Sequence, residues 1–305
     1  MDTRKLIPCL AVMLLLAMAS GASAVTIETH FIGGRGPSNA VGGGNLNDIV
    51  RAAAHMWEAA YADPVTLTIY YGWGPSTDAG THTLLTQGYS PNREVSGLII
   101  FDNSGSTRFY LDPTPYTNEE YRGRTDEYQD LGGGLMNVAR IFRTPTDEAA
   151  ANLDLFSVAL HEIGHALGMS TANLSFTNQC ARGLLIISRR LPFSGAEIPI
   201  SYNNFGIVSH FDALEITYGS VMTGINAGER RVLSGLDIIA NAQLSGFTIA
   251  NLNAQQPYPA NVLSETNTRL QIGLTAPVPA MPNSQIIRKK ADIQNRQFRM
   301  RLFTR

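Results

Sequence analysis

One short segment constrains the fold of this chain more than any other, because it combines a helix pattern with three residues suited to a metal site. Residues 146–167 are predicted to form a helix that closes at Gly168, a residue suited to the left-handed turn after a helix. The segment carries His161, Glu162 and His165. Histidines four residues apart project from the same helix face, so both imidazoles can reach one ion.

Zinc suits this arrangement, since imidazole is a borderline ligand and a catalytic zinc site keeps one position open for water. Glu162 points about 100 degrees away from His161 and can hold that water. Bound zinc lowers the water pKa to about 7, and a neighbouring carboxylate can accept the proton as hydroxide attacks a carbonyl. The alternative is a helix whose histidines are ordinary surface or core residues.

The residues that follow carry a family resemblance. From His161 to Gly168 the sequence resembles the metzincin zinc endopeptidases, whose extended motif is HExxHxxGxxH followed by a methionine turn. The place of the third histidine falls on Thr171. His210 lies further on, twelve residues before Met222, and this order is similar to the leishmanolysin-like branch, in which an insertion separates the glycine from the third histidine. Residues 233–238 are similar to the closing helix of many metzincins.

This resemblance, which covers roughly residues 26–250, implies a set of roles. His161, His165 and His210 would bind Zn²⁺, Glu162 would be the general base, and Met222 would form an apolar floor under the ligands. The implied activity is that of a zinc endopeptidase, a hydrolase that cleaves peptide bonds with zinc-activated water.

Alternatives for the third ligand and for Met222 remain. Asp212 and Glu215 compete with His210, because carboxylates also bind zinc, and Glu215 would make the site resemble a gluzincin. We favour His210, since the Met turn and the closing helix fit no gluzincin pattern. Met222 has an alternative role as core filler. Another alternative is a non-catalytic secreted binding module on the same scaffold.

The wider pattern predicts an α+β fold of the metzincin-like zincin type. It would have a mixed twisted sheet, the active-site helix and a mainly helical or irregular C-terminal subdomain. Further helices are predicted over 45–63 and 234–244, strands over 25–31, 65–71, 97–101, 107–111 and 135–142, a surface loop over 112–130 and irregular structure over 171–209.

Substrate binding is expected at an edge strand. In metzincins an edge strand above the active-site helix pairs with an extended peptide or protein segment, and by its order the strand 135–142 is the candidate. The remaining histidines, His30, His55 and His82, are expected to be surface residues.

The ends of the chain predict export. Residues 1–24 read as a signal peptide, with Arg4 and Lys5, an apolar run and a small-residue cleavage site before Val25. The mature protein would be secreted or periplasmic, with a catalytic domain over 25–255, a Pro-containing linker and basic tail over 256–305, and no later transmembrane segment. Cys180 is the one cysteine left after removal of the signal, so it is expected to be a buried apolar filler.

Charge disfavours nucleic acid as a partner. Residues 256–305 hold eight Lys or Arg and two Asp or Glu, although the whole chain has a formal net charge of -2. The body of the protein is therefore acidic, and an acidic surface repels phosphate backbones.

Overall fold

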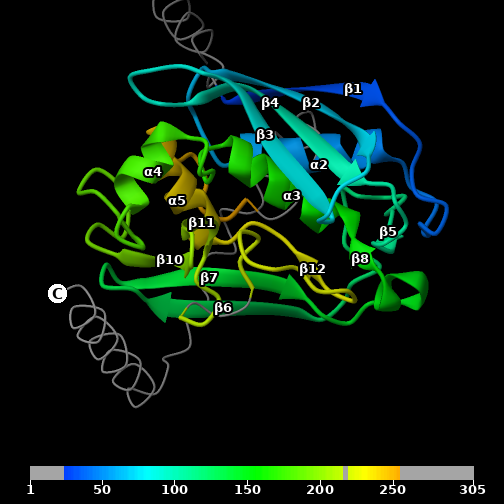
Figure 1. The fold of residues 1–305 in the computed structure, drawn as a ribbon. Helices are drawn as coiled ribbons and strands as arrows, with labels where there is room; N and C mark the ends of the chain where they lie inside the picture. Colours follow the sequence, from blue (N-terminus) through cyan, green and yellow to red (C-terminus); the bar gives the residue numbers. More distant parts are fainter. Residues whose placement is uncertain (1–23, 216–218, 255–305) are drawn as a thin grey trace, which may run out of the picture.

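The computed structural model describes residues 24–215 and 219–254, and it shows helices packed between two β-sheets (Figure 1). The α+β fold class is confirmed. The predicted signal peptide, apart from Ala24, and the linker and tail from 256 onward lie outside the described residues. Within the described ranges, no helix is both long enough and apolar enough to cross a bilayer.

The upper sheet in Figure 1 is mixed and has the strand order β1-β2-β4-β3. Strands β1 (Thr26–Gly33), β2 (Thr66–Gly74) and β4 (Glu94–Asp102) are parallel to one another, and β3 (Gly80–Gln87) pairs antiparallel with β4. Strands β1, β2 and β4 fall where the sequence predicts them. Strand β3 was not predicted, because its first four residues, from Gly80 to Thr83, include no apolar side chain and the strand lacks a clear alternation of apolar and polar residues.

Two helices lie under this sheet and pack against each other. Helix α2 (Leu46–Glu58) begins at its N-cap Asn45, and helix α3 (Leu155–Ala166) begins at its N-cap Asp154. The indole N–H of Trp57 in α2 donates a buried 3.0 Å hydrogen bond to the Leu160 carbonyl in α3, which fixes the two helices relative to each other.

Helix α3 is shorter than the predicted 146–167. Its expected first turn is a separate 3₁₀ helix, η2 (Asp147–Ala151), followed by the short strand β8 (Leu153–Asp154), which pairs with β5 (Phe109–Tyr110). The Asp154 carboxylate accepts from the Ser157 amide, so the helix begins at this cap.

The lower sheet corrects two predictions. It has the order β12-β7-β6, formed by β12 (Arg230–Arg231), β7 (Leu135–Phe142) and β6 (Arg124–Asp130). The loop prediction for 112–130 is wrong at β6. The edge-strand prediction for 135–142 is also wrong, since β7 lies between β6 and β12, with β12 pairing at Ile141 and Phe142, and is buried along most of its length.

The C-terminal part is more regular than expected. Helix α4 (Leu174–Cys180) is followed by a sheet of β9 (Leu184–Ile186), β10 (Glu197–Asn203) and β11 (Gly206–Phe211), so the prediction of irregular structure over 171–209 is wrong. The closing helix α5 (Gly235–Ser245) is confirmed, with Ser234 and Asp237 forming a capping box. Cys180 is buried, as predicted.

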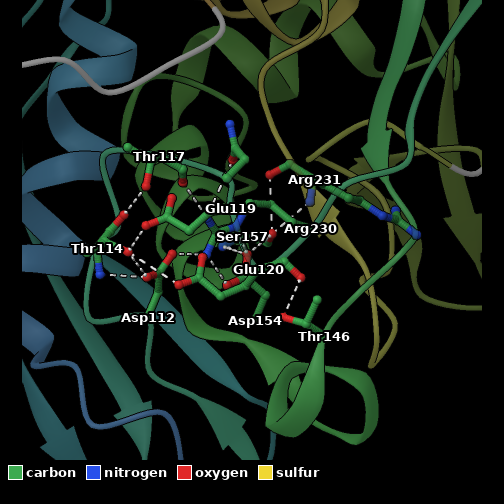
Figure 2. Close-up of polar contacts among 11 residues, drawn as sticks. Asp112, Thr114, Thr117, Glu119, Glu120, Thr146, Asp154, Ser157, Arg230 and Arg231 are labelled. Atoms are coloured by element: carbon green, nitrogen blue, oxygen red, sulfur yellow. Dashed lines mark hydrogen bonds and ion pairs between the residues drawn. The ribbon is translucent and has the colours of Figure 1, made fainter.

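A buried ion cluster holds the N-terminal end of α3 (Figure 2). Arg230 of β12 makes two 2.9 Å hydrogen bonds to the carboxylate of Asp154 and one to that of Asp112. All three side chains are fully buried. The bidentate geometry is the strong form of an Arg–carboxylate pair, so this cluster fixes where helix α3 begins.

Candidate metal centre

Three histidines from two elements converge below the upper sheet. His161 and His165 lie one turn apart on α3, and His210 lies on β11. The Nε2 atom of His161 is 3.0 Å from Nε2 of His165 and 3.0 Å from Nε2 of His210. Among the described residues, these three form the group of potential metal ligands, with all ligand atoms within 4.8 Å of one another.

The hydrogen bonds of the Nδ1 atoms determine whether the converging Nε2 atoms carry protons. Nδ1 of His161 lies 2.7 Å from the Val221 carbonyl, and Nδ1 of His165 lies 2.6 Å from the Met169 carbonyl. A carbonyl only accepts, so each Nδ1 must carry the proton, and in a neutral ring Nε2 is then a bare acceptor. Two bare acceptors 3.0 Å apart do not form a hydrogen bond; a cation between them would make the arrangement favourable.

Burial keeps these rings neutral. It lowers the pKa of His161 to about 3, with the neighbouring His210 adding to the effect. Burial is also the main reason that the pKa of His165 lies well below its ordinary value, and it lowers the pKa of His210. Neutral imidazole is the form that binds metals.

The donor set fits zinc. In tetrahedral coordination with Zn–N bonds of 2.0–2.1 Å, ligand nitrogens are about 3.3 Å apart, close to the 3.0 Å spacings seen here. Three imidazoles leave the fourth position for a water or a substrate oxygen.

The turn around Met222 supports two of the ligands. The Met222 side chain is fully buried, and a Cβ atom added at Gly164 of α3 would overlap its Sδ. The backbone of the turn holds His161 through the Val221 carbonyl, and the Met222 carbonyl accepts a 3.1 Å hydrogen bond from the Phe211 amide, next to His210. The turn therefore lies under the helix and ties β11 to it.

Asp237 of the closing helix fixes that turn. Its buried carboxylate accepts from the Ser220 hydroxyl, from the amides of Val221 and Met222, and from Ser234. Burial raises the pKa of Asp237, and these donors oppose the rise. Asp237 thus has a second role beside the capping box, and this role depends on a turn fifteen residues earlier in the chain.

Glu162 is enclosed beside the histidines. It is 4% exposed, and a Cβ atom added at Gly80 of β3 would come within 2.8 Å of its Oε1. Gly80 thus makes room for the carboxylate, a role with no sequence signal. Burial raises the pKa of Glu162 to about 8, and the nearby Asp78 adds to the rise.

The alternative ligands lie outside the group. The Asp212 carboxylate accepts from the Leu214 amide at 2.9 Å, and neither Asp212 nor Glu215 is among the described residues that converge with His161. Thr171 is exposed, and its amide donates to the Ser209 hydroxyl at 2.9 Å. The loop after α3 therefore runs alongside β11, and His210 reaches the centre from that strand.

The other histidines differ from one another. His30 is exposed and His55 half-buried. The prediction that His82 is a surface residue is wrong, because its side chain is 2% exposed and lies 2.7 Å from the Glu94 carboxylate. Its partner Glu94 lies on β4, twelve residues later in the chain. His82 reaches this partner because it lies on β3, a strand that was not predicted and that pairs with β4.

One comparison with known proteins adds to this geometry. The family model of the matrixin peptidases matches residues 63–175, a range that contains all of α3 and ends before His210. No curated protein and no solved structure matches the chain. Fold, histidine geometry and family match together support a metzincin-type zinc metalloprotease.

Proposed function

We propose that this protein is a secreted zinc endopeptidase in which His161, His165 and His210 hold the metal and Glu162 is the general base. The convergence of the three Nε2 atoms carries the proposal, because His161 and His165 have their other nitrogen committed to a carbonyl. Without an ion such a site would not stabilise the fold, since buried acceptors that face each other are unfavourable.

Zinc bound there would supply a water of lowered pKa and would polarise the carbonyl of the substrate. Glu162 follows His161 directly on α3, so its carboxylate lies beside the converging histidines and can accept a proton from the water held there. Because Glu162 is almost fully enclosed against Gly80, few water molecules compete for that proton. The same carboxyl group can then pass the proton to the leaving amine.

We further propose that the substrate is an extended peptide or protein segment that pairs with β3. This strand is hydrogen-bonded to β4 on one side and, within the described residues, forms the edge of the upper sheet. It contacts α3, and Gly80 at its start lies against Glu162. An unpaired strand edge offers backbone donors and acceptors to an extended chain.

The branch within the metzincins belongs to the same proposal. His210 comes after an inserted segment that contains α4, β9 and β10, which supports the leishmanolysin-like arrangement. Export is supported by the basic start, apolar run and small-residue site within residues 1–24.

The direct test is zinc per molecule in the purified full chain, measured for wild type, His210→Ala and the exposed control His30→Ala. We expect one zinc in the wild type and in the control, and a large loss in His210→Ala. Asp212→Ala and Glu215→Ala should keep the metal. A folded wild type that takes up no supplied zinc would contradict the proposal and favour a non-catalytic binding module.

A further inference from the structure

A second buried polar pair lies behind the metal centre. His82 of β3 and Glu94 of β4 are joined by a 2.7 Å contact between Nε2 and Oε1, and their side chains are 2% and 0% exposed. The pair takes no part in the roles proposed above.

The sheet leaves a gap for this pair at Gly97. A Cβ atom added there would overlap Glu94 Oε1 and would lie 3.0 Å from His82 Nε2. Gly97 therefore permits the carboxylate and the imidazole to meet inside the sheet–helix interface, and any side chain at this position would push them apart.

The His82 ring faces a candidate zinc ligand. Its plane lies 22° from that of His165, with ring centroids 6.3 Å apart, which is within the range of offset stacking. The other two ligand rings meet His165 at steep angles, 89° for His161 and 68° for His210. Of these three imidazoles, His82 is thus the one whose ring plane is close to parallel to that of His165.

A stacked ring can restrict the tilt of the His165 ring, which its hydrogen bond does not fix. Nδ1 of His165 is held by one carbonyl, that of Met169, and a single hydrogen bond does not by itself fix the tilt of the ring about that contact. A stacked neighbour restricts the tilt, provided that the neighbour is itself held. Glu94 holds His82 in this way.

We propose that His82 is a positioning residue for His165, clamped by Glu94, and that it couples the edge strand β3 to the metal centre. The proposal rests on the proposed function in that it takes His165 to be a zinc ligand. It concerns ring orientation, and orientation of ligands by outer residues affects metal affinity.

The test uses a variant chosen to remain folded. Removing His82 alone would leave the Glu94 carboxylate buried and unpaired, so His82→Leu is paired with the double variant His82→Leu/Glu94→Leu, which removes both polar groups. Glu94→Gln keeps an acceptor for His82 and serves as the conservative variant. His30→Leu, which changes an exposed histidine of the same sheet, is the matched control.

Three quantities are measured on the full chain: zinc affinity by competition with a chromophoric chelator, the visible absorption bands of the cobalt(II) form, and urea unfolding of the metal-free protein. In the double variant we expect zinc affinity to fall about 3- to 10-fold, as for loss of one aromatic contact, with shifted cobalt bands. Glu94→Gln and His30→Leu should resemble the wild type in both metal readouts.

Two outcomes would overturn the proposal alone. One is a double variant whose zinc affinity and cobalt bands match those of the wild type. The other is weaker zinc binding that merely follows a loss of stability in the metal-free protein, with unchanged cobalt bands, because that indicates a structural pair. Absence of zinc from the wild type would overturn the proposed function as well.

Discussion

The two ends of helix α3 both bury polar side chains, yet they satisfy them in opposite ways. At the N-terminal end, Asp154 caps the helix and, with Asp112, surrounds the guanidinium of Arg230 (Figure 2). Acceptors there meet donors within the protein. Burial lowers the pKa of the Arg230 guanidinium and the neighbouring carboxylates raise it. The effect of the carboxylates is larger, so the pKa is raised.

At the C-terminal end, His161 and His165 present bare acceptors to each other, and Nε2 of His210 lies 3.0 Å from that of His161. Their pKa values are lowered by burial, so protons do not relieve the arrangement. Buried polar groups therefore have two different roles in this helix. The ion cluster, in which donors and acceptors are paired, stabilises the fold, whereas unpaired histidine acceptors that face each other favour binding of a cation. Predictions for the two ends should accordingly differ in kind.

The largest expected effect is on the rate at the metal end. Glu162→Gln keeps the size of the side chain and removes the proton acceptor, so peptide hydrolysis should fall about 100-fold to 10,000-fold. Zinc content and the urea midpoint should stay close to wild type. The measurement is kcat/KM on a peptide mixture of defined composition.

Glu28→Gln, at an exposed position of β1, is the control and should leave the rate unchanged. Full hydrolysis by purified Glu162→Gln would assign the activity to a contaminant or to another base. It would contradict the proposed role of Glu162 as the general base.

The next effect concerns stability at the other end. Arg230→Leu leaves Asp112 and Asp154 buried without their partner, so the free energy of unfolding should drop by about 3–5 kcal/mol, measured by urea titration. The folded fraction should still bind one zinc, because Arg230 contacts none of the three histidines.

Arg143→Leu removes a pair of 3.8 Å with Glu127 in which the arginine side chain is 47% exposed, and it should cost less than about 1 kcal/mol. Equal losses for the two arginine variants would mean that the buried cluster does not order α3.

The two ends also differ in how far the sequence predicts them. His161, Glu162 and His165 stand within five residues, so helical spacing alone places them together. His210 required the resemblance, because its approach depends on the fold of β10 and β11. Arg230 meets Asp112 across 118 residues, and no local pattern links them.

Strands were missed where their side chains have no apolar face. Strand β6 runs from Arg124 to Asp130, with charged or polar residues at almost every position and partial burial at every position after the exposed Arg124. Such an edge strand is specified by its pairing with β7 and not by its own pattern. The prediction for His82 failed for the same reason, since its burial follows from the pairing of β3 with β4.

The smallest effect tests how tightly Met222 packs beneath the metal end. Gly164→Ala should favour the helix by about 0.5–1 kcal/mol, but the new methyl group would overlap Met222 Sδ, and overpacking costs about 1–3 kcal/mol. We expect a net loss of about 1 kcal/mol by urea titration. Gly224→Ala, in the same turn with no atom near its added Cβ, should be neutral.

A double-mutant cycle with Met222→Ala makes this test specific. Met222→Ala alone should lose about 2–5 kcal/mol, because it leaves a cavity under α3. In Gly164→Ala/Met222→Ala the methyl group enters that cavity, so the double loss should be smaller than the sum of the single losses by at least about 1 kcal/mol. Strict additivity would mean that Met222 does not press on the helix at Gly164, and the floor under His161 and His165 would then need another explanation.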